Sequence, residues 1–264
     1  MKNELAFAFL SIKKNIQNSA ELRANFLGQI IGMIINNSSF ILLWVFFVKS
    51  VGNVNGWEAS DILALQAFTA LGFGIVFSFF GGITKINENV DSGVFDQFML
   101  SPKNLLIRVM TSSFSSSALG DILFSLLTFV IYFCIVKATF IKILLLFILI
   151  FFSSLLFLAV CLFTFSLSFY FTNSNRFVFS LFELFLTPAM FHSGAIQGKM
   201  RFIFTFILPS LLVGGIPSEI LKNIDWNQGV VLIAMTLFWS IFSCWFFYFS
   251  VAKYESSNFF TFGK

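Results

Sequence analysis

The chain has 264 residues, of which 58% are hydrophobic, 19% aromatic and 11% charged, with a formal net charge of +4 and a mean hydropathy of +0.92. Because a soluble domain usually carries about 25% charged residues, a soluble fold of this composition would expose large apolar patches and aggregate. The composition therefore predicts an integral membrane protein, and it excludes a disordered chain and a nucleic-acid-binding protein, since the sixteen Lys and Arg form no dense basic tract.

The first 25 residues are predicted to form an amphipathic helix on the membrane surface. Four apolar residues at helical spacing form a stripe along one face, namely Leu5, Phe9, Ile12 and Ile16. The neighbouring Lys13 and Lys14 lie on another face. Such a helix would lie along the cytoplasmic interface with its lysines near anionic lipid head groups. Residues 1–25 are therefore interpreted as an elbow helix that leads into the first span.

Six segments are predicted to cross the membrane. A hydrocarbon core about 30 Å thick needs roughly 20 apolar residues in a helix. The stretches that meet or approach this length with almost no charged residues are 26–48, 62–83, 110–136, a part of 143–175, 177–191 and 230–252. The fifth is the shortest and contains Glu183, and the third contains Asp121. We therefore predict an all-α integral membrane protein, with residues 1–264 forming a single domain of six transmembrane helices.

The segment between the fifth and sixth spans is predicted not to cross the membrane. Residues 202–216 are apolar but too few for a span, and three prolines bracket or interrupt them: Pro188, Pro209 and Pro217. Residues 192–226 are therefore expected to form an extracellular re-entrant helical hairpin. With six spans, ten Lys and Arg lie on the side of both termini and six on the other side. The positive-inside rule then places both termini, including the tail 253–264, in the cytoplasm.

The cytoplasmic loop 85–108 is predicted to contain a short amphipathic helix that ends at Pro102. Apolar side chains recur along it every fourth residue, namely Val90, Val94 and Phe98, with Phe95 and Met99 beside them. Such a helix offers an apolar face to a peripheral partner protein. The alternative is a helix that rests on the bilayer surface.

Polar side chains inside the predicted spans are candidates for a transport path or a dimer interface: Gln29, Asn36, Asn37, Asp121 and Glu183. An ionisable group at membrane depth is costly unless it is paired or hydrated, so each acid either forms a structural hydrogen bond or serves transport. The amides of the first span belong on a protein-facing surface or in a water-filled cavity. Gly28 and Gly32 form a G-x-x-x-G motif, which allows a second helix to approach closely.

No catalytic or metal-binding pattern stands out. His192 is the single histidine, and no G-x-S motif accompanies it. The segment most like a phosphate-binding loop, residues 194–200, lacks one spacer residue and the Ser or Thr that would contact magnesium. We therefore expect a chain that is not an enzyme, does not hydrolyse nucleotide by itself, and binds no cofactor or metal.

Three segments together carry a family resemblance. Residues 91–102 hold a glycine, apolar residues, an aspartate and a final proline after the second span; proline-punctuated helices follow the fifth span; and the tail reads Lys253-Tyr254-Glu255-Ser256. This order resembles the permease subunits of bacterial ABC-2 type transporters, whose tail signature has arginine where Lys253 stands. Phe98 and Met99 occupy positions where that family more often has leucine.

The resemblance implies an exporter permease in the cell membrane that pairs with an identical or homologous second permease. It also implies two ATP-binding subunits, which would hold the ATP and magnesium. In the family, the loop after span two docks in a groove of the ATP-binding subunit, and the matching positions here are Gly93, Val94, Phe95, Asp96, Phe98 and Leu100. The expected cargo is an amphipathic or lipid-like molecule, a drug or a peptide, moved outward by alternating access.

Three other functions stay open from the sequence. A secondary transporter or channel would use Asp121 and Glu183 as proton or ion sites and would need no ATPase partner. An intramembrane enzyme would depend on His192. A substrate-capture subunit of an importer would bind its ligand tightly when purified alone.

Overall fold

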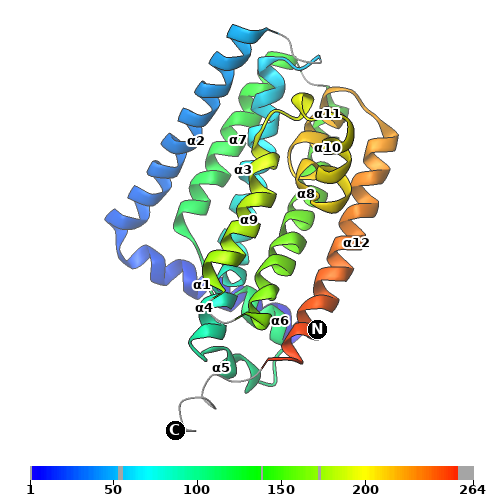
Figure 1. Cartoon of the computed structure of the whole chain (residues 1–264). Coiled ribbons are helices and arrows are strands. Elements are labelled where there is room, and N and C mark those ends of the chain that lie inside the picture. Colours follow the sequence, from blue (N-terminus) through cyan, green and yellow to red (C-terminus); the bar gives the residue numbers. More distant parts are fainter. Residues whose placement is uncertain (1, 53–55, 138, 172–173, 255–264) are drawn as a thin grey trace.

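We describe a computed structural model of the chain over residues 2–52, 56–137, 139–171 and 174–254, which consist of helices and turns without a β-strand. The all-helical fold class is confirmed. Five helices are long and apolar enough to cross a membrane: α2 (Arg23–Val51), α3 (Ala59–Phe79), α7 (Ser116–Val136), α8 (Phe140–Ser166) and α12 (Trp226–Val251). They form the elongated bundle in Figure 1. Each contains one of the predicted spans or most of it.

The predicted fifth span is the one that falls short. Helix α9 (Asn175–Met190) has 16 residues, with Pro188 inside its last turn. It packs against α3 and α8 and runs along the bundle in Figure 1. By length and composition the described residues therefore supply five spans, and the sixth stays a prediction.

Helix α3 is the centre of the bundle. Of its most apolar window 78% is buried, against 11% for the corresponding window of α2. It contacts α2, α7, α8, α9 and α11. Helix α2 reaches the bundle mainly through α7, where Gly120 permits the approach, since a Cβ atom there would lie 2.5 Å from the Ile30 carbonyl oxygen. Most of α2 is therefore left uncovered within one chain.

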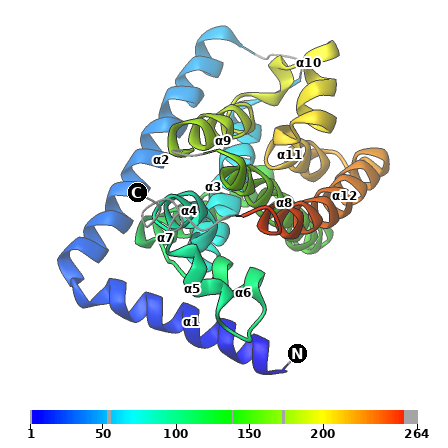
Figure 2. The same ribbon diagram turned by 60° about the horizontal axis from the view of Figure 1, so that its bottom comes forward.

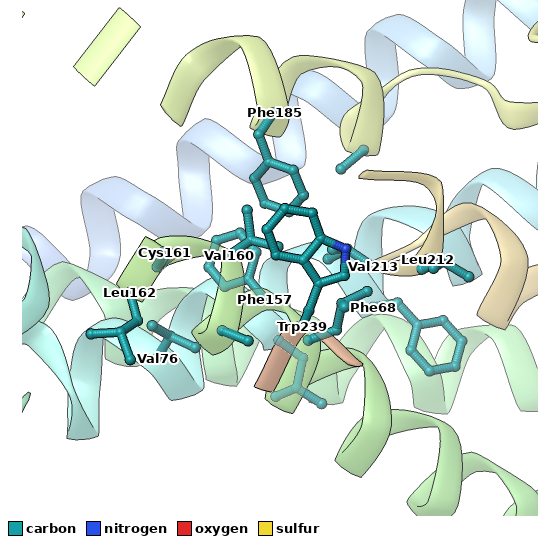
Figure 3. Close-up of a cluster of buried hydrophobic side chains, with 14 of the residues drawn as sticks. Phe68, Val76, Phe157, Val160, Cys161, Leu162, Phe185, Leu212, Val213 and Trp239 are labelled. Atoms are coloured by element: carbon teal, nitrogen blue, oxygen red, sulfur yellow. The ribbon is translucent and has the colours of Figure 1, made fainter. Parts of the chain in front are cut away.

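Aromatic rings from α3, α8, α9 and α12 pack in the core between these helices (Figure 3). The ring of Phe157 on α8 lies 5.8 Å from Phe185 on α9 and 6.0 Å from Phe77 on α3, measured between centroids. Leu212 and Val213, which precede α11, close the same cluster. The Phe77 and Phe157 rings meet edge to face, at an interplanar angle of 76°, and such a contact adds to the packing of the rings. The abundant phenylalanines therefore act here as packing residues that join α9 to the long helices.

Both ends of the described chain lie at one end of the bundle, together with loop 85–108 (Figure 2). We call this the loop end. Helix α1 (Lys2–Glu21) lies across it, at a large angle to α2. The Ser11 hydroxyl and the Asn15 side-chain amide both donate to the Thr111 carbonyl oxygen, at 2.7 and 2.9 Å. Leu5 and Phe9 point outward and are exposed. The N-terminal segment is therefore helical over Lys2–Glu21, whereas its role as an elbow helix and its position on a membrane stay predictions.

The prediction of a single amphipathic helix in loop 85–108 is wrong. The chain forms η1 (Gly81–Lys85), α4 (Ile86–Asp91), α5 (Phe95–Met99) and α6 (Leu105–Met110) instead. The break between α4 and α5 falls at Gly93, whose φ of 73° is a left-handed conformation that glycine adopts without a steric penalty. The apolar period of four therefore continues across a turn that periodicity alone does not reveal.

The third span begins later than predicted, at Ser116 instead of about residue 110. Serine side chains interrupt the helix between α6 and α7, and the Ser112 hydroxyl donates to the Val109 carbonyl oxygen at 2.8 Å. Such local bonds compete with helical backbone bonds, which explains the break.

At the opposite end, which we call the α11 end, residues 192–226 form short helical pieces: η3 (Ser193–Ala195), α10 (Gly198–Phe202), η4 (Ile203–Ile207), η5 (Ser210–Leu212) and α11 (Gly215–Lys222). Helix α11 packs against α3, α8 and α12, so the segment folds back onto the bundle. Lys222 Nζ lies 2.6 Å from Asp61 Oδ2, and Arg201 Nη1 donates to Glu219 Oε1 at 3.1 Å. The depth of this segment in a membrane stays a prediction.

Candidate functional site

The most exposed apolar side chains of loop 85–108 form a small surface at the tip of the loop end. Val94, Met99 and Leu100 are 39%, 49% and 86% exposed. We call these three residues the tip surface. Val94 lies in the turn before α5, and the other two residues end that helix. Two of the six predicted docking positions, Val94 and Leu100, are thus available to a partner protein.

Phe95 does not belong to this surface. Its side chain is completely buried, and its ring lies 4.9 Å from Phe169 and 5.2 Å from Tyr254. Gly93 is buried as well. The interpretation of Phe95 as an anchor for a partner's groove is therefore corrected, because in this conformation it anchors the loop to its own bundle. The apolar repeat correctly marks Phe95 as a contact residue, but the contact is with the chain's own bundle and not with a partner protein.

The remaining two positions, Asp96 and Phe98, are half-buried and also serve the loop. The Arg108 guanidinium lies 5.6 Å from the centroid of the Phe98 ring. Its Nη1 atom donates to the carbonyl oxygens of Gln97 and Phe98, at 2.9 and 2.8 Å. Arg108 thereby satisfies carbonyl groups at the C-terminal end of α5, where a helix lacks internal partners. This role of Arg108 has no signal in the sequence.

Tyr254 connects the tail to the loop. Its ring packs on Phe95 and lies 5.8 Å from Phe169. Burial, together with the Asp96 carboxylate beside the hydroxyl, raises the pKa of Tyr254 from 10 to about 12. The tail signature and the loop motif, about 150 residues apart in the chain, therefore meet in one cluster. The rest of the tail signature, from Glu255 onward, lies outside the described residues.

We expect Tyr254→Ala to loosen loop 85–108 and Tyr254→Phe to preserve it. Removing the half-buried ring should cost about 1–2 kcal/mol of unfolding free energy, whereas the phenylalanine ring keeps the packing. Because the folded-state pKa lies above the ordinary value of 10, wild-type stability should decline from pH 10 to pH 12, and that decline should be smaller in Tyr254→Phe. Thermal unfolding of the purified protein across this pH range measures both effects. Equal stability of all three proteins would contradict the role of the ring.

A second connection runs from the loop to α9. The side-chain amide of Asn87, which is completely buried in α4, donates to Asn175 Oδ1 at the start of α9, at 2.9 Å. Loop 85–108 is thus fixed to α9 through Asn87 and to the ends of α8 and α12 through Phe95. A displacement of the tip surface would therefore move these helices with it.

The polar side chains predicted inside the first span lie on two different faces of α2. The Asn37 side-chain amide donates to Asp121 Oδ1 of α7 at 2.6 Å, and the Ser116 hydroxyl of α7 donates to Gln29 Oε1. Asn36, one residue before Asn37, is exposed on another face of α2. Asn37 and Gln29 therefore join α2 to α7 within one chain, whereas the exposed Asn36 takes no part in these bonds.

The two acids within the apolar helices also differ. Asp121 is buried in the α2–α7 contact, whereas Glu183 is exposed on α9. An exposed carboxylate on a helix inside a membrane needs water or a second protein chain around it. The structure does not bring Asp121 and Glu183 into a common site.

A cavity of about 510 Å³ with a mixed polar and apolar lining opens between α1, α2, α3, α7 and α9 at the loop end. Its walls carry the hydroxyl or amide groups of Asn25, Gln29, Thr84 and Ser115, and the rings of Phe73, Phe77 and Phe182. Lys85 contributes a cation that pairs with Glu88, with Nζ–Oε2 at 2.9 Å. The cavity therefore offers neutral hydrogen-bonding groups beside aromatic rings.

Among the residues that the structure describes, no group of three or more His, Cys, Asp or Glu side chains could hold a metal ion. His192 lies buried at the α11 end, with its ring 4.9 Å from that of Trp57. Burial lowers its pKa. His192 is thus a neutral, buried side chain that packs against Trp57 at that end of the bundle.

A family model described as "ABC-2 family transporter protein" matches residues 33–258. The match includes loop 85–108, the α11 end and Tyr254. No curated protein and no solved structure matches the chain.

Proposed function

Because the chain belongs to the ABC-2 family of transporter proteins and is a multi-pass membrane protein of that family, we propose that it is the permease subunit of an ATP-driven exporter. A separate ATP-binding subunit, in two copies, would bind ATP and magnesium and hydrolyse the nucleotide. This chain would supply the path through the membrane, together with an identical or homologous second permease. The proposed location is the plasma membrane.

The observation that carries this proposal is the exposed tip surface on a loop that is fixed to three helices. Val94, Met99 and Leu100 present apolar area to the surroundings, and the burial of apolar surface is the main favourable term in most protein–protein association. Phe95 and Asn87 hold the loop against α8, α9 and α12. A partner that moves the tip surface would therefore tilt these helices, which is the kind of coupling that alternating access requires.

We further propose six crossings, with the loop end in the cytoplasm and the α11 end outside. Helix α9 would make the additional crossing, because an even number of crossings agrees with α1 and the end of α12 lying at the same end of the bundle. The excess of Lys and Arg on the loop side supports this orientation. Helix α1 would then rest on the cytoplasmic surface with Leu5 and Phe9 toward the lipid.

The proposed contact with the second permease is the uncovered face of α2. Cβ atoms at Gly28 and Gly32 would meet no heavy atom within 4 Å, and Asn36 is exposed further along the helix. Small residues let a second helix approach closely, and an amide in hydrocarbon needs a protein partner or water. Glu183 on α9 has the same need, so the transport path would lie between α2, α9 and the second permease.

The proposed cargo is an amphipathic or lipid-like molecule, including drugs and peptides of that character. The loop-end cavity supports this cargo class, because it places hydroxyl and amide groups beside the rings of Phe73, Phe77 and Phe182. Such a lining can bind a neutral polar group and an apolar body at the same time.

Purification of the tagged chain from its native membranes tests the proposed function. We expect an ATP-binding cassette protein to co-purify, and ATP hydrolysis by the purified complex to depend on it. Recovery of no nucleotide-binding protein, together with transport driven by an ion gradient, would instead support a secondary transporter that uses Asp121 and Glu183.

Cysteine labelling tests the proposed orientation. We expect Ser92→Cys, in the exposed turn after α4, to react with a membrane-impermeant maleimide only after the cells are opened. Lys199→Cys, exposed at the α11 end, should react in intact cells. Labelling of both positions from the same side would contradict the six crossings.

A further inference from the structure

Helix α9 exposes a polar side, whereas α8 exposes an apolar one. Every exposed side chain of α8 is apolar. In α9 the buried side is the apolar one, with Val178, Phe182, Phe185 and Ala189. Polar and charged residues recur at helical spacing on its exposed side, namely Arg176, Ser180, Glu183 and Thr187. In the proposed crossing, such a side needs water or protein around it instead of lipid.

Glu183 lies between two cavities that both border α2 and α9. Phe179 lines the loop-end cavity, and Thr187 lines a second cavity of about 510 Å³ at the α11 end. Residues four positions apart lie on one face of a helix, so Glu183 takes the middle position in the row from Phe179 to Thr187. All three side chains are exposed. The face of α9 that runs from one cavity to the other therefore carries a carboxylate at its midpoint.

The chain itself does not neutralise this carboxylate. Within the part of the chain that the structure describes, Glu183 forms no ion pair. Arg176 precedes it by two helical turns, about 10 Å along the helix axis. The Lys85 ammonium in the lining of the loop-end cavity already pairs with Glu88. A charged group at membrane depth is costly unless it is paired or hydrated, so Glu183 needs water or a counter-charge that another molecule brings.

A second copy of the chain does not supply that counter-charge. In a dimer of identical chains about an axis normal to the membrane, residues of equal depth face each other. The long helices α3, α7 and α12 contain no Lys or Arg. Those of α2, α8 and α9 lie close to a helix end, namely Arg23, Lys49, Lys142 and Arg176. No basic residue of an identical partner would therefore reach the depth of Glu183, and the transported molecule is the remaining source.

We propose that Glu183 is a specificity-determining residue, which binds the positively charged group of a cationic amphipathic cargo. This inference rests on the proposed function, because that function places the cargo between α2 and α9. A cation that leaves water for an apolar path needs an opposite charge beside it, and the Glu183 carboxylate supplies one. The exposed Phe179 ring, one helical turn away, adds a surface that attracts cations. An anionic cargo would be repelled, and a neutral cargo would leave the carboxylate unpaired.

Tetraphenylphosphonium and tetraphenylborate are matched probes, because both carry four phenyl rings and they differ in the sign of their charge. The complex that the tagged chain forms is purified in an uncharged detergent. Equilibrium dialysis against each probe then measures the saturable binding above that of protein-free micelles. We expect saturable binding of tetraphenylphosphonium, and binding of tetraphenylborate that is weaker by about tenfold or more.

Glu183→Gln removes the charge and keeps the size of the side chain. Because Glu183 is exposed, the variant should keep the unfolding temperature of the wild type. Its affinity for tetraphenylphosphonium should fall by about threefold to tenfold. Glu21→Gln is the matched control, because Glu21 is exposed on α1 and lines neither cavity, and it should bind the probe as the wild type does.

Equal binding of the two probes to the wild type would overturn the proposal, as would unchanged tetraphenylphosphonium binding in Glu183→Gln. Equal weakening in Glu21→Gln would also overturn it, since the overall charge of the protein would then explain the effect. The binding assay needs no ATP, so it separates this inference from the proposed function. A complex that contains an ATP-binding cassette protein and does not bind tetraphenylphosphonium would reject the cationic cargo alone. Binding that depends on Glu183 in the absence of such a protein would support the residue's role and reject ATP-driven export.

Discussion

Leu100→Glu is expected to uncouple the permease from the proposed ATP-binding subunit while the permease still folds. Leu100 is 86% exposed, so a glutamate there remains in water when the chain is alone and costs the fold almost nothing. In a docked complex the same carboxylate would be buried in an apolar groove without a partner. Truncation of a central anchor commonly costs about 2 kcal/mol or more, which is a loss of about thirtyfold in affinity.

The measurement is the amount of ATP-binding subunit that stays with the purified permease, together with ATP-driven transport in vesicles. Leu100→Met is the matched control, because methionine keeps the apolar volume at the same position, and both quantities should stay near wild type. Leu100→Glu protein with an unchanged unfolding temperature and unchanged coupling would show that the tip surface is not the docking surface. Equivalent loss in Leu100→Met would instead indicate that the site tolerates leucine alone.

The sequence predicts the long helices well, because a charge-free stretch of about 20 residues has few alternatives to a membrane-spanning helix. Five such stretches became α2, α3, α7, α8 and α12. The fifth predicted span became α9, whose 16 residues fall below that length. Hydropathy therefore identifies a span by length, and it loses its power where proline and a charge shorten the apolar run.

The neighbours of the side chains in loop 85–108 do not follow from the sequence, because a period of four identifies an apolar face and does not say what covers it. Val94 and Phe95 are neighbours in the sequence, yet the first is exposed and the second is in the core. The turn at Gly93 determines the direction in which each side chain points. A glycine does not by itself predict a turn, because glycine occurs in many other conformations as well. Packing of Phe95 on Tyr254 depends on residues far along the chain, which local patterns do not encode.

Two adjacent amides in α2 also have surroundings that the sequence does not predict. Asn36 and Asn37 are the same residue type, and the sequence makes both of them candidates for a transport path or a dimer interface. One residue corresponds to about 100° around a helix, so the two side chains point in different directions. Asn37 bonds to Asp121 within the chain, whereas Asn36 faces outward. The site residues of α2 are therefore separated into a structural pair and a surface position only by the packing of α7.

Phe95→Ala is expected to destabilise the loop end strongly, in contrast to Leu100→Glu. Phe95 lies outside the spanning helices, so its burial removes apolar surface from water, and replacing a fully buried phenylalanine by alanine commonly costs about 3–5 kcal/mol. The cavity left behind would free Phe169 and Tyr254, which both pack on the ring. Loss of this cluster should detach the tail and the loop from each other before the spans unfold.

Limited proteolysis of the purified protein in detergent measures this local opening, and a thermal unfolding curve measures the global loss. Phe140→Ala is the matched control, because the same atoms are removed from a side chain that is 78% exposed at the start of α8, and little change is expected. Rapid cleavage within loop 85–108 of Phe95→Ala alone would establish Phe95 as the residue that joins the tip surface to the bundle. Wild-type resistance to cleavage, combined with lost binding of the ATP-binding subunit, would instead return Phe95 to the docking surface, and the loop would then have to open before it docks.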